Sequence, residues 1–257
     1  MRILAIGDVT SPGGICHLEN NLWRIRRERK IDFCVVNGEN AAFVTGISPE
    51  LADQLLKSGA DVITGGNHTL RNRSAFEYLD DTKEMLRPIN FGKSAPGRGY
   101  TILDANGYRI LVINAMGNVH IEPVLDSPYG FIDEVLLEER GNYDFSVLDI
   151  HAEATGEKGA VAYSFDGKIN VIFGTHTHVQ TADETILPKG TGYITDVGMC
   201  GESLGILGME PNSVISRMRT KIANKFKSAT GACVANGAIF TLDTTTGKVT
   251  DIERISF

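Results

Sequence analysis

The sequence lacks long apolar runs, paired cysteines and any block of like charge. Its first apolar stretch, Ile3–Ile6, is far shorter than the ~20 residues that cross a bilayer. We therefore expect neither a secretory signal nor a membrane partner. No two cysteines form a C-x-x-C pair, which argues against a thiolate zinc site. Scattered cysteines without a signal peptide are typical of a reducing compartment, and they predict a cytoplasmic protein.

The sequence also lacks the positive charge that binding to a polynucleotide requires. Its 25 basic and 32 acidic residues give a net charge of -7. Because a broad polynucleotide-binding surface is basic, we expect no polymeric nucleic acid as a partner. A small anionic substrate stays compatible with this charge, because bound metal can reverse the local field. The length of 257 residues suits a globular α/β protein, and we predict a single domain over 1–257. A homo-oligomer is compatible with this sequence.

Buried strands alternate with helices in the first third of the chain. Apolar runs predict the strands, and Ser48 with Pro49 marks a helix that Gly59 ends. Ser74 and Glu77 form a capping-box pattern for a further helix. Strands and helices at this spacing indicate parallel βαβ units. The expected strands are 2–8, 32–36 and 61–64, and the expected helices are 17–29, 48–59 and 74–85.

The second part of the chain predicts a mixed sheet arrangement. Asn106-Gly107 between two apolar runs is typical of a β-hairpin. Residues 117–130 have no clear periodicity, and we expect them to form a loop beside the site. The remaining expected strands are 144–150, 169–176, 192–195, 233–235, 238–242 and 248–254, and the expected helices are 154–163 and 211–226. The simplest architecture is one α/β domain with two sheets.

Two histidines, His176 and His178, follow the apolar run 169–173. If that run continues as a strand, residues two apart point to the same face. Two imidazoles on one face can bind a metal ion such as zinc, iron, nickel or copper. An isolated H-x-H pair is also compatible with exposed or hydrogen-bonded histidines. The residues at the other strand ends therefore determine which interpretation is favoured.

Four other apolar runs also end in side chains that can bind metal. In open α/β sheets, functional residues collect beyond the carboxyl ends of the strands. Each residue has another interpretation: a helix cap, a turn former, a solvated acid or a core histidine. Their coincidence at five strand ends favours one shared metal site. The residues are Asp8, Glu39-Asn40, Asn67-His68 and His151, in addition to His176 and His178.

These motifs together resemble the calcineurin-like metallophosphoesterases, and more narrowly their YmdB-like branch. The resemblance extends over nearly the whole chain. Thr10 and Glu39-Asn40 depart from the broad superfamily in the way that this branch does. Leu70, Arg71 and His120 depart from the branch itself, and they leave substrate preference open. The matching motifs are Gly7-Asp8, Gly38-Glu39-Asn40, Gly66-Asn67-His68-Thr69, 151–155 and 174–184.

The resemblance implies a sandwich of two mixed β-sheets flanked by helices in αββα layers. It also implies a dinuclear metal centre with iron, or alternatively manganese, zinc or magnesium. Glu39 would bridge the two ions. The implied ligands are Asp8, Glu39, Asn40 and His178 for one ion, and Glu39, Asn67, His151 and His176 for the other. His68 would donate a hydrogen bond or a proton to the departing alkoxide, and its alternative role is to support a ligand.

The implied activity is that of a hydrolase, a metal-dependent phosphodiesterase. Its substrates would be small cyclic nucleotides, the 2′,3′-cyclic nucleoside monophosphates, attacked at phosphorus by a metal-bridged hydroxide. One alternative is a broader phosphodiesterase or phosphomonoesterase on the same centre. Another is a regulatory protein that senses a nucleotide with weak turnover. Metal-dependent C–N hydrolysis fits less well, because there the H-x-H pair normally follows the first strand.

Overall fold

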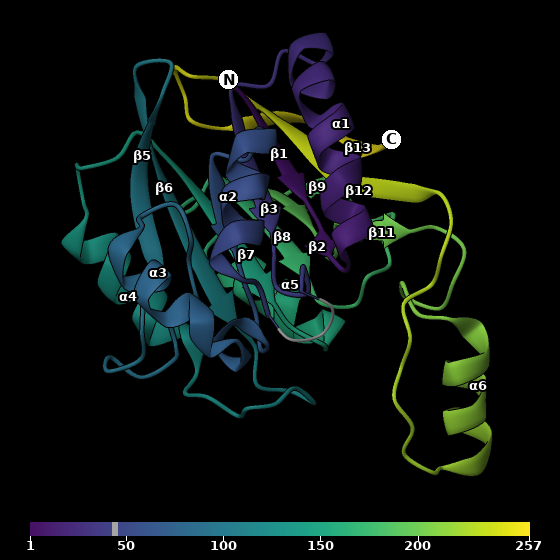
Figure 1. Ribbon diagram of the computed structural model, residues 1–257. Helices are drawn as coiled ribbons and strands as arrows, with labels where there is room; N and C mark the ends of the chain where they lie inside the picture. Colours follow the sequence, from purple (N-terminus) through teal and green to yellow (C-terminus); the bar gives the residue numbers. More distant parts are fainter. Residues whose placement is uncertain (43–45) are drawn as a thin grey trace.

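Two mixed β-sheets face each other in the computed structural model, which describes residues 1–42 and 46–257 (Figure 1). In the first sheet, β1 pairs in parallel with β3 and antiparallel with β12, so amino-terminal and carboxy-terminal segments lie side by side. Its strand order is β2 (Asp8–Val9), β11 (Met199–Glu202), β12 (Cys233–Leu242), β1 (Arg2–Ile6), β3 (Phe33–Asn37) and β4 (Val62–Thr64), with β13 (Val249–Ser256) on β12.

The second sheet begins with the predicted hairpin. Asn106 and Gly107 have φ values of 51° and 84°, the left-handed conformations that a tight two-residue turn requires. From the second strand of this hairpin to β10, neighbouring strands run parallel. The order is β5 (Tyr100–Ala105), β6 (Tyr108–Met116), β7 (Phe145–His151), β8 (Val171–Thr175), β10 (Gly192–Ile194) and β9 (Thr185–Ile186).

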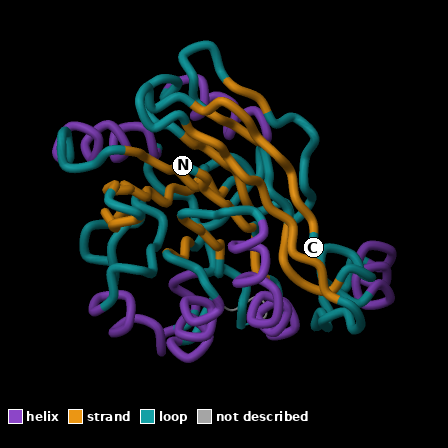
Figure 2. Tube along the Cα trace, turned by 90° about the horizontal axis from the view of Figure 1, so that it is seen from above, coloured by secondary structure: helices purple, strands orange, loops and turns teal. Residues whose placement is uncertain are grey.

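Helices cover the outer face of each sheet. On the first sheet they are α1 (Pro12–Glu28), α2 (Pro49–Ser58) and α3 (Phe76–Asp81), and on the second α4 (Pro128–Glu138) and α5 (Thr155–Ser164). Alternation along β1 divides the core: Ile3 and Ala5 pack between the sheets, whereas Leu4 packs beneath the helices. Figure 2 shows the strands at the centre and helices around them. The predicted αββα layers are thus confirmed.

Helix α1 begins earlier than the sequence predicted. Its N-cap is Ser11, whose hydroxyl accepts a hydrogen bond from the Gly14 amide, and Pro12 follows at the first helical position. We expected a glycine-rich turn and a helix from residue 17. The glycines are helical because the helix packs tightly here: a Cβ at Gly14 would lie 2.4 Å from the Cys200 carbonyl oxygen.

Three other predicted elements have different bounds. The capping box at Ser74 was wrong: the Asn72 side chain accepts from the Ser74 amide, and short 3-10 turns (Thr69–Arg71, Arg73–Ala75) precede α3. The expected loop 117–130 ends at residue 127, because α4 starts at Pro128. The helix expected over 211–226 is α6 (Pro211–Thr220), which ends where Lys221 adopts a left-handed φ of 60°.

Residues 203–232, called the arm from here on, connect β11 to β12. These two strands are antiparallel partners, with Glu202 opposite Cys233, so the arm is an insertion within a hairpin. Its helix α6 extends away from the sandwich, at the lower right of Figure 1. Among the described helices, none is both long enough and apolar enough to cross a membrane. The single-domain assignment over 1–257 stays a prediction.

Candidate metal centre

Strand ends from both sheets converge at one edge of the sandwich. β1 and β2 deliver Asp8, β3 delivers Glu39 and Asn40, and the segment after β4 delivers Asn67 and His68. His151 ends β7, and His176 with His178 follow β8. All eight side chains that the sequence singled out are linked by contacts of 2.5 to 3.9 Å.

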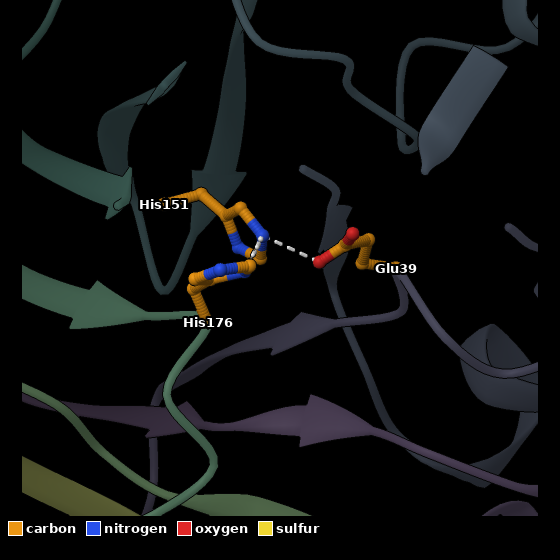
Figure 3. Close-up of side chains that lie close together, drawn as sticks. All are labelled: Glu39, His151 and His176. Atoms are coloured by element: carbon orange, nitrogen blue, oxygen red, sulfur yellow. Dashed lines mark hydrogen bonds and ion pairs between the residues drawn. The ribbon is translucent and has the colours of Figure 1, made fainter. Parts of the chain in front are cut away.

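Glu39, His151 and His176 form the tightest part of this cluster. Figure 3 shows their side chains pointing toward one another from three separate segments. Glu39 Oε2 lies 2.5 Å from His151 Nε2, and His176 Nδ1 lies 3.1 Å from the same nitrogen. Their ligand atoms all fall within 4.8 Å of one another. Asn67 Oδ1 lies 3.2 Å from His151 Nε2 and adds a fourth atom that could bind a metal ion.

The second part of the cluster holds Asp8, Asn40 and His178. His178 Nε2 lies 3.9 Å from Asp8 Oδ1 and 3.5 Å from Asn40 Nδ2. The Asp8 carboxylate is completely buried, and its other oxygen accepts a hydrogen bond of 3.0 Å from the His176 backbone amide. Asp8 therefore orients the turn that carries both histidines, while one of its oxygens faces His178.

A hydrogen-bond chain fixes the His151 ring with its Nε2 lone pair toward the cluster. Thr175 Oγ1 donates to Asp149 Oδ1 at 2.7 Å, so its oxygen accepts from His151 Nδ1 at 2.9 Å. Nδ1 then carries the proton and Nε2 is the acceptor. Asp149 also accepts from Asn37 at 2.9 Å, and burial raises its pKa to about 7. Thr175 thus supports a candidate ligand, and its hydroxyl is engaged in that contact.

The oxygen and nitrogen atoms of this cluster fit a bound cation. Asp8 Oδ1 and Glu39 Oε2 are buried oxygens without a hydrogen-bond partner among the described residues, an arrangement that costs free energy unless a positive charge satisfies it. The lone pair of His151 Nε2 faces the oxygens of Glu39 and Asn67, so acceptors converge on acceptors. Burial lowers the pKa of His151 to about 4 and of His176 to about 3, which keeps both imidazoles neutral. Burial has the opposite effect on the pKa of the Asp8 carboxyl, which it raises.

The histidine pair does not lie on a strand, which corrects the sequence-based expectation. β8 ends at Thr175, and His176 and His178 have left-handed φ values of 100° and 63°. Such values strain non-glycine residues, so the surrounding contacts must hold them. The turn, and not the pleat of a strand, aims the two imidazoles at different parts of the cluster.

A buried ion pair holds this turn. Lys158 Nζ donates to Asp196 Oδ2 and to the Thr175 carbonyl oxygen, each at 2.7 Å, and both charged side chains are completely buried. Asp196 Oδ2 also accepts from the Thr177 amide at 3.1 Å and from its hydroxyl at 2.7 Å. Sequence reasoning missed both residues, although Asp196 follows the strand expected over 192–195 and obeys the same strand-end rule.

His68 lies at the rim of the cluster. Its Nδ1 is 2.7 Å from Asn40 Oδ1 and 3.0 Å from Glu39 Oε1, and its backbone amide donates to Glu39 as well. Burial lowers the pKa of His68, and the Glu39 charge opposes this shift. Because Nδ1 is engaged by two oxygens, Nε2 is the nitrogen that stays available to a substrate.

A cavity of about 470 Å³ opens beside the cluster. Its polar end is formed by Asn40, His68, Glu153, His176, Thr177 and His178, and its apolar end by Ile206, Leu207, Met209, Val214, Met218 and Phe226. The apolar wall comes from the arm and not from the loop that we expected beside the site. Leu70, Arg71 and His120 are not among the described residues that line it.

Comparisons with known proteins agree with these features. A family model described as "YmdB-like protein" matches residues 4–255. A Bacillus subtilis protein named 2′,3′-cyclic-nucleotide 2′-phosphodiesterase is 42% identical, over 99% of this chain and 96% of the relative. A solved structure from Thermus thermophilus, described as a hypothetical protein, is 34% identical with a TM-score of 0.92, covering 100% of this chain and 99% of its own.

A further solved structure, described as a novel phosphatase from Mycoplasma pneumoniae, is 32% identical with a TM-score of 0.92 and covers 100% of this chain and 93% of its own. These full-length similarities confirm the predicted enzyme class, a phosphoric ester hydrolase related to 2′,3′-cyclic-nucleotide 2′-phosphodiesterase. With two sheets, side chains that converge from five strand ends and a family model that matches nearly from end to end, the chain belongs to the YmdB-like family.

Proposed function

We propose that this protein is a metal-dependent phosphodiesterase that hydrolyses small cyclic nucleotides, the 2′,3′-cyclic nucleoside monophosphates. The observation that carries the proposal is the convergence of buried acceptor atoms from five strand ends, where the described part of the chain gives Asp8 Oδ1 and Glu39 Oε2 no hydrogen-bond partner. The printed activity of the Bacillus subtilis relative supports the substrate class. A small anionic substrate also fits a chain whose net charge is -7 better than a polynucleotide does.

The two parts of the cluster divide into two overlapping ligand sets. Glu39 would be the carboxylate common to both, since its Oε2 contacts His151 while its Oε1 lies 3.0 Å from His68 Nδ1, which also contacts Asn40. A shared carboxylate reduces the repulsion between two cations about 4 Å apart. The proposed sets are Asp8, Glu39, Asn40 and His178 for one ion, and Glu39, Asn67, His151 and His176 for the other. Iron is the proposed metal, with manganese, zinc and magnesium as alternatives for this nitrogen and oxygen donor set.

When bound, the metal ions supply Lewis acidity and lower the pKa of water, so that a nucleophile for phosphorus exists near neutral pH. The chain itself orients the reaction. Asn40 and His178 border the cavity at its polar end, where the phosphate would lie. His68 donates from Nδ1 to Asn40 Oδ1, so in its protonated form, which the Glu39 charge favours, Nε2 can donate to the departing ribose oxygen. Opening the strained cyclic phosphate then yields a nucleoside monophosphate.

The test combines metal analysis with substrate comparison. Purified protein, loaded with iron or manganese, is assayed on 2′,3′-cyclic AMP, 3′,5′-cyclic AMP and p-nitrophenyl phosphate. We expect about two metal ions per chain and the highest kcat/KM on 2′,3′-cyclic AMP. His176→Ala should lose metal and turnover, whereas His120→Asn should keep both, because His120 is exposed and lies outside the cavity.

Two results would reject the proposal. Protein without stoichiometric metal that stays inactive after iron or manganese is added would exclude the metal centre. Preferred turnover of p-nitrophenyl phosphate would identify a phosphomonoesterase on the same centre.

A further inference from the structure

The arm carries an apolar surface that the packing of the sandwich does not use. Met218 is 63% exposed and Leu207 44% exposed, although both are large apolar side chains. Both line the cavity whose other end is formed by His176 and His178. One continuous cavity therefore joins the metal-binding side chains to an apolar wall. Such a division, polar at one end and apolar at the other, is typical of small-molecule sites.

The arm is held in a defined shape at the cavity. The Asn224 side chain donates to the Ser213 carbonyl at 2.8 Å, and the Glu210 amide donates to the Lys227 carbonyl at 2.8 Å, so the segment after α6 is fastened to the helix. The Arg217 guanidinium lies 4.7 Å from the centroid of the Phe226 ring. This contact keeps Phe226 at the wall and places a cation beside it.

The charge of the arm differs in sign from that of the whole chain. The arm has five basic residues and one carboxylate, Glu210, which gives it a formal charge of +4, whereas the chain carries -7. A local positive field of this kind attracts anions toward the adjoining cavity. The basic residues are Arg217, Arg219, Lys221, Lys225 and Lys227. An anionic substrate with a flat apolar substituent matches both the charge and the wall.

We propose that the arm is the nucleobase subsite of this enzyme, with Met218 and Phe226 packing on the base while the cyclic phosphate lies at His176 and His178. The proposal rests on the proposed function and adds how the substrate is selected. The cavity volume of about 470 Å³ lies within the range of roughly 300–1,000 Å³ typical of small-molecule sites. None of the six arm side chains that line the cavity bears an N–H or O–H group. The subsite therefore accepts any base with little discrimination.

The test compares a cyclic nucleotide with ethylene phosphate, which has the same five-membered cyclic phosphate but no base. Met218→Ser should lower the ratio of kcat/KM for 2′,3′-cyclic AMP to that for ethylene phosphate by on the order of 10-fold, as expected when an apolar side chain no longer packs on the base. Met218→Leu, which keeps a large apolar side chain, should have the same ratio as the wild type. In the wild-type protein, KM for the four 2′,3′-cyclic nucleotides should agree within about threefold.

Ile215→Ser is the matched control. Ile215 lies on the same helix and is 43% exposed, but it does not line the cavity. It should leave the substrate ratio unchanged. Because both positions are exposed, neither substitution removes a core contact, and their thermal unfolding temperatures should match that of the wild type.

An unchanged ratio in Met218→Ser, or an equal change in Ile215→Ser, would overturn the subsite. So would a dimer that Met218→Ser converts to monomers without altering the ratio, because a second copy would then cover the wall. Affinity for 3′-AMP, measured by equilibrium dialysis, separates this proposal from the proposed function. Metal-loaded protein without turnover would refute the proposed phosphodiesterase activity. Even then, weaker binding of 3′-AMP by Met218→Ser than by the wild type would support the nucleobase subsite, and equal binding would reject it.

Discussion

Replacing Lys158 with methionine tests how the two histidines after β8 are held. Methionine has a similar length but no charge, so Lys158→Met leaves the Asp196 carboxylate buried and without its cation. Removing one partner of a buried ion pair costs about 3–5 kcal/mol. Asp196 keeps its bonds to Thr177 and Gly198, which favours the lower end of that range. The Thr175 carbonyl also loses its bond from Lys158, at a cost of about 1 kcal/mol.

The loss should appear in two measurements, because the pair holds the turn that carries His176 and His178. Urea unfolding of the metal-free protein should show a free energy of unfolding lower by about 3–4 kcal/mol. Titration calorimetry on the molecules that remain folded should show weaker manganese binding, by about 10- to 100-fold, as for other groups that orient metal ligands.

Lys168→Met provides the control. Its ion pair with Asp133 is exposed, with side-chain accessibilities of 56% and 59%, and its ammonium lies 5.3 Å from the Phe165 ring centroid, so losing both contacts should cost only about 1 kcal/mol. If Lys158→Met were no more costly than Lys168→Met, the buried pair would not stabilise the fold. A large loss of stability with wild-type manganese affinity would refute the link between the pair and the histidine turn.

Three further substitutions or treatments test the centre. Gly66→Ala should reduce metal content and turnover, because its Cβ would lie 2.3 Å from His151 Nε2; Gly156→Ala, with nothing within 4 Å, should leave both at wild-type levels. Thr175→Val keeps the side-chain shape but removes the hydroxyl that fixes His151, so a competing chelator should report about 10- to 100-fold weaker metal binding. Chelation of the wild type should lower the unfolding temperature, since a ligand at 100 times its Kd stabilises by about 2.7 kcal/mol; an equal decrease in His176→Ala would show that the metal acts elsewhere.

The convergence of the candidate ligands could be predicted because parallel strands end at one edge of a sheet. Asp8, Glu39 and His151 are each separated by long stretches of sequence, yet each follows an apolar run. That rule needs no knowledge of side-chain packing, and the structure brings all these residues into one cluster. The helix bounded by Ser48 and Gly59 was also predictable, because cap residues act locally: Ser48 accepts from Leu51, and Gly59 has a φ of 117°.

Features that depend on long-range packing could not be predicted. The left-handed turn at His176 and His178 has no local signal, since it results from contacts with Asp8 and Asp196. Lys158 looks like a solvated helix residue until α5 is placed against β8. The start of α1 was missed because Gly13 and Gly14 weaken a helix unless close neighbours require them, here Glu202 beside Gly13 and Cys200 beside Gly14.

Because the arm is inserted within a hairpin, its length and sequence are independent of the strand ends that carry the candidate metal site. Its two ends are joined by a hydrogen bond of 2.9 Å from the Ser203 amide to the Ala232 carbonyl, directly beyond the β11–β12 pair. Each doubling of a loop held at its ends costs only about 0.6 kcal/mol. The arm could therefore be lengthened, shortened or replaced, in evolution or by design, while the side chains at the strand ends keep the same arrangement.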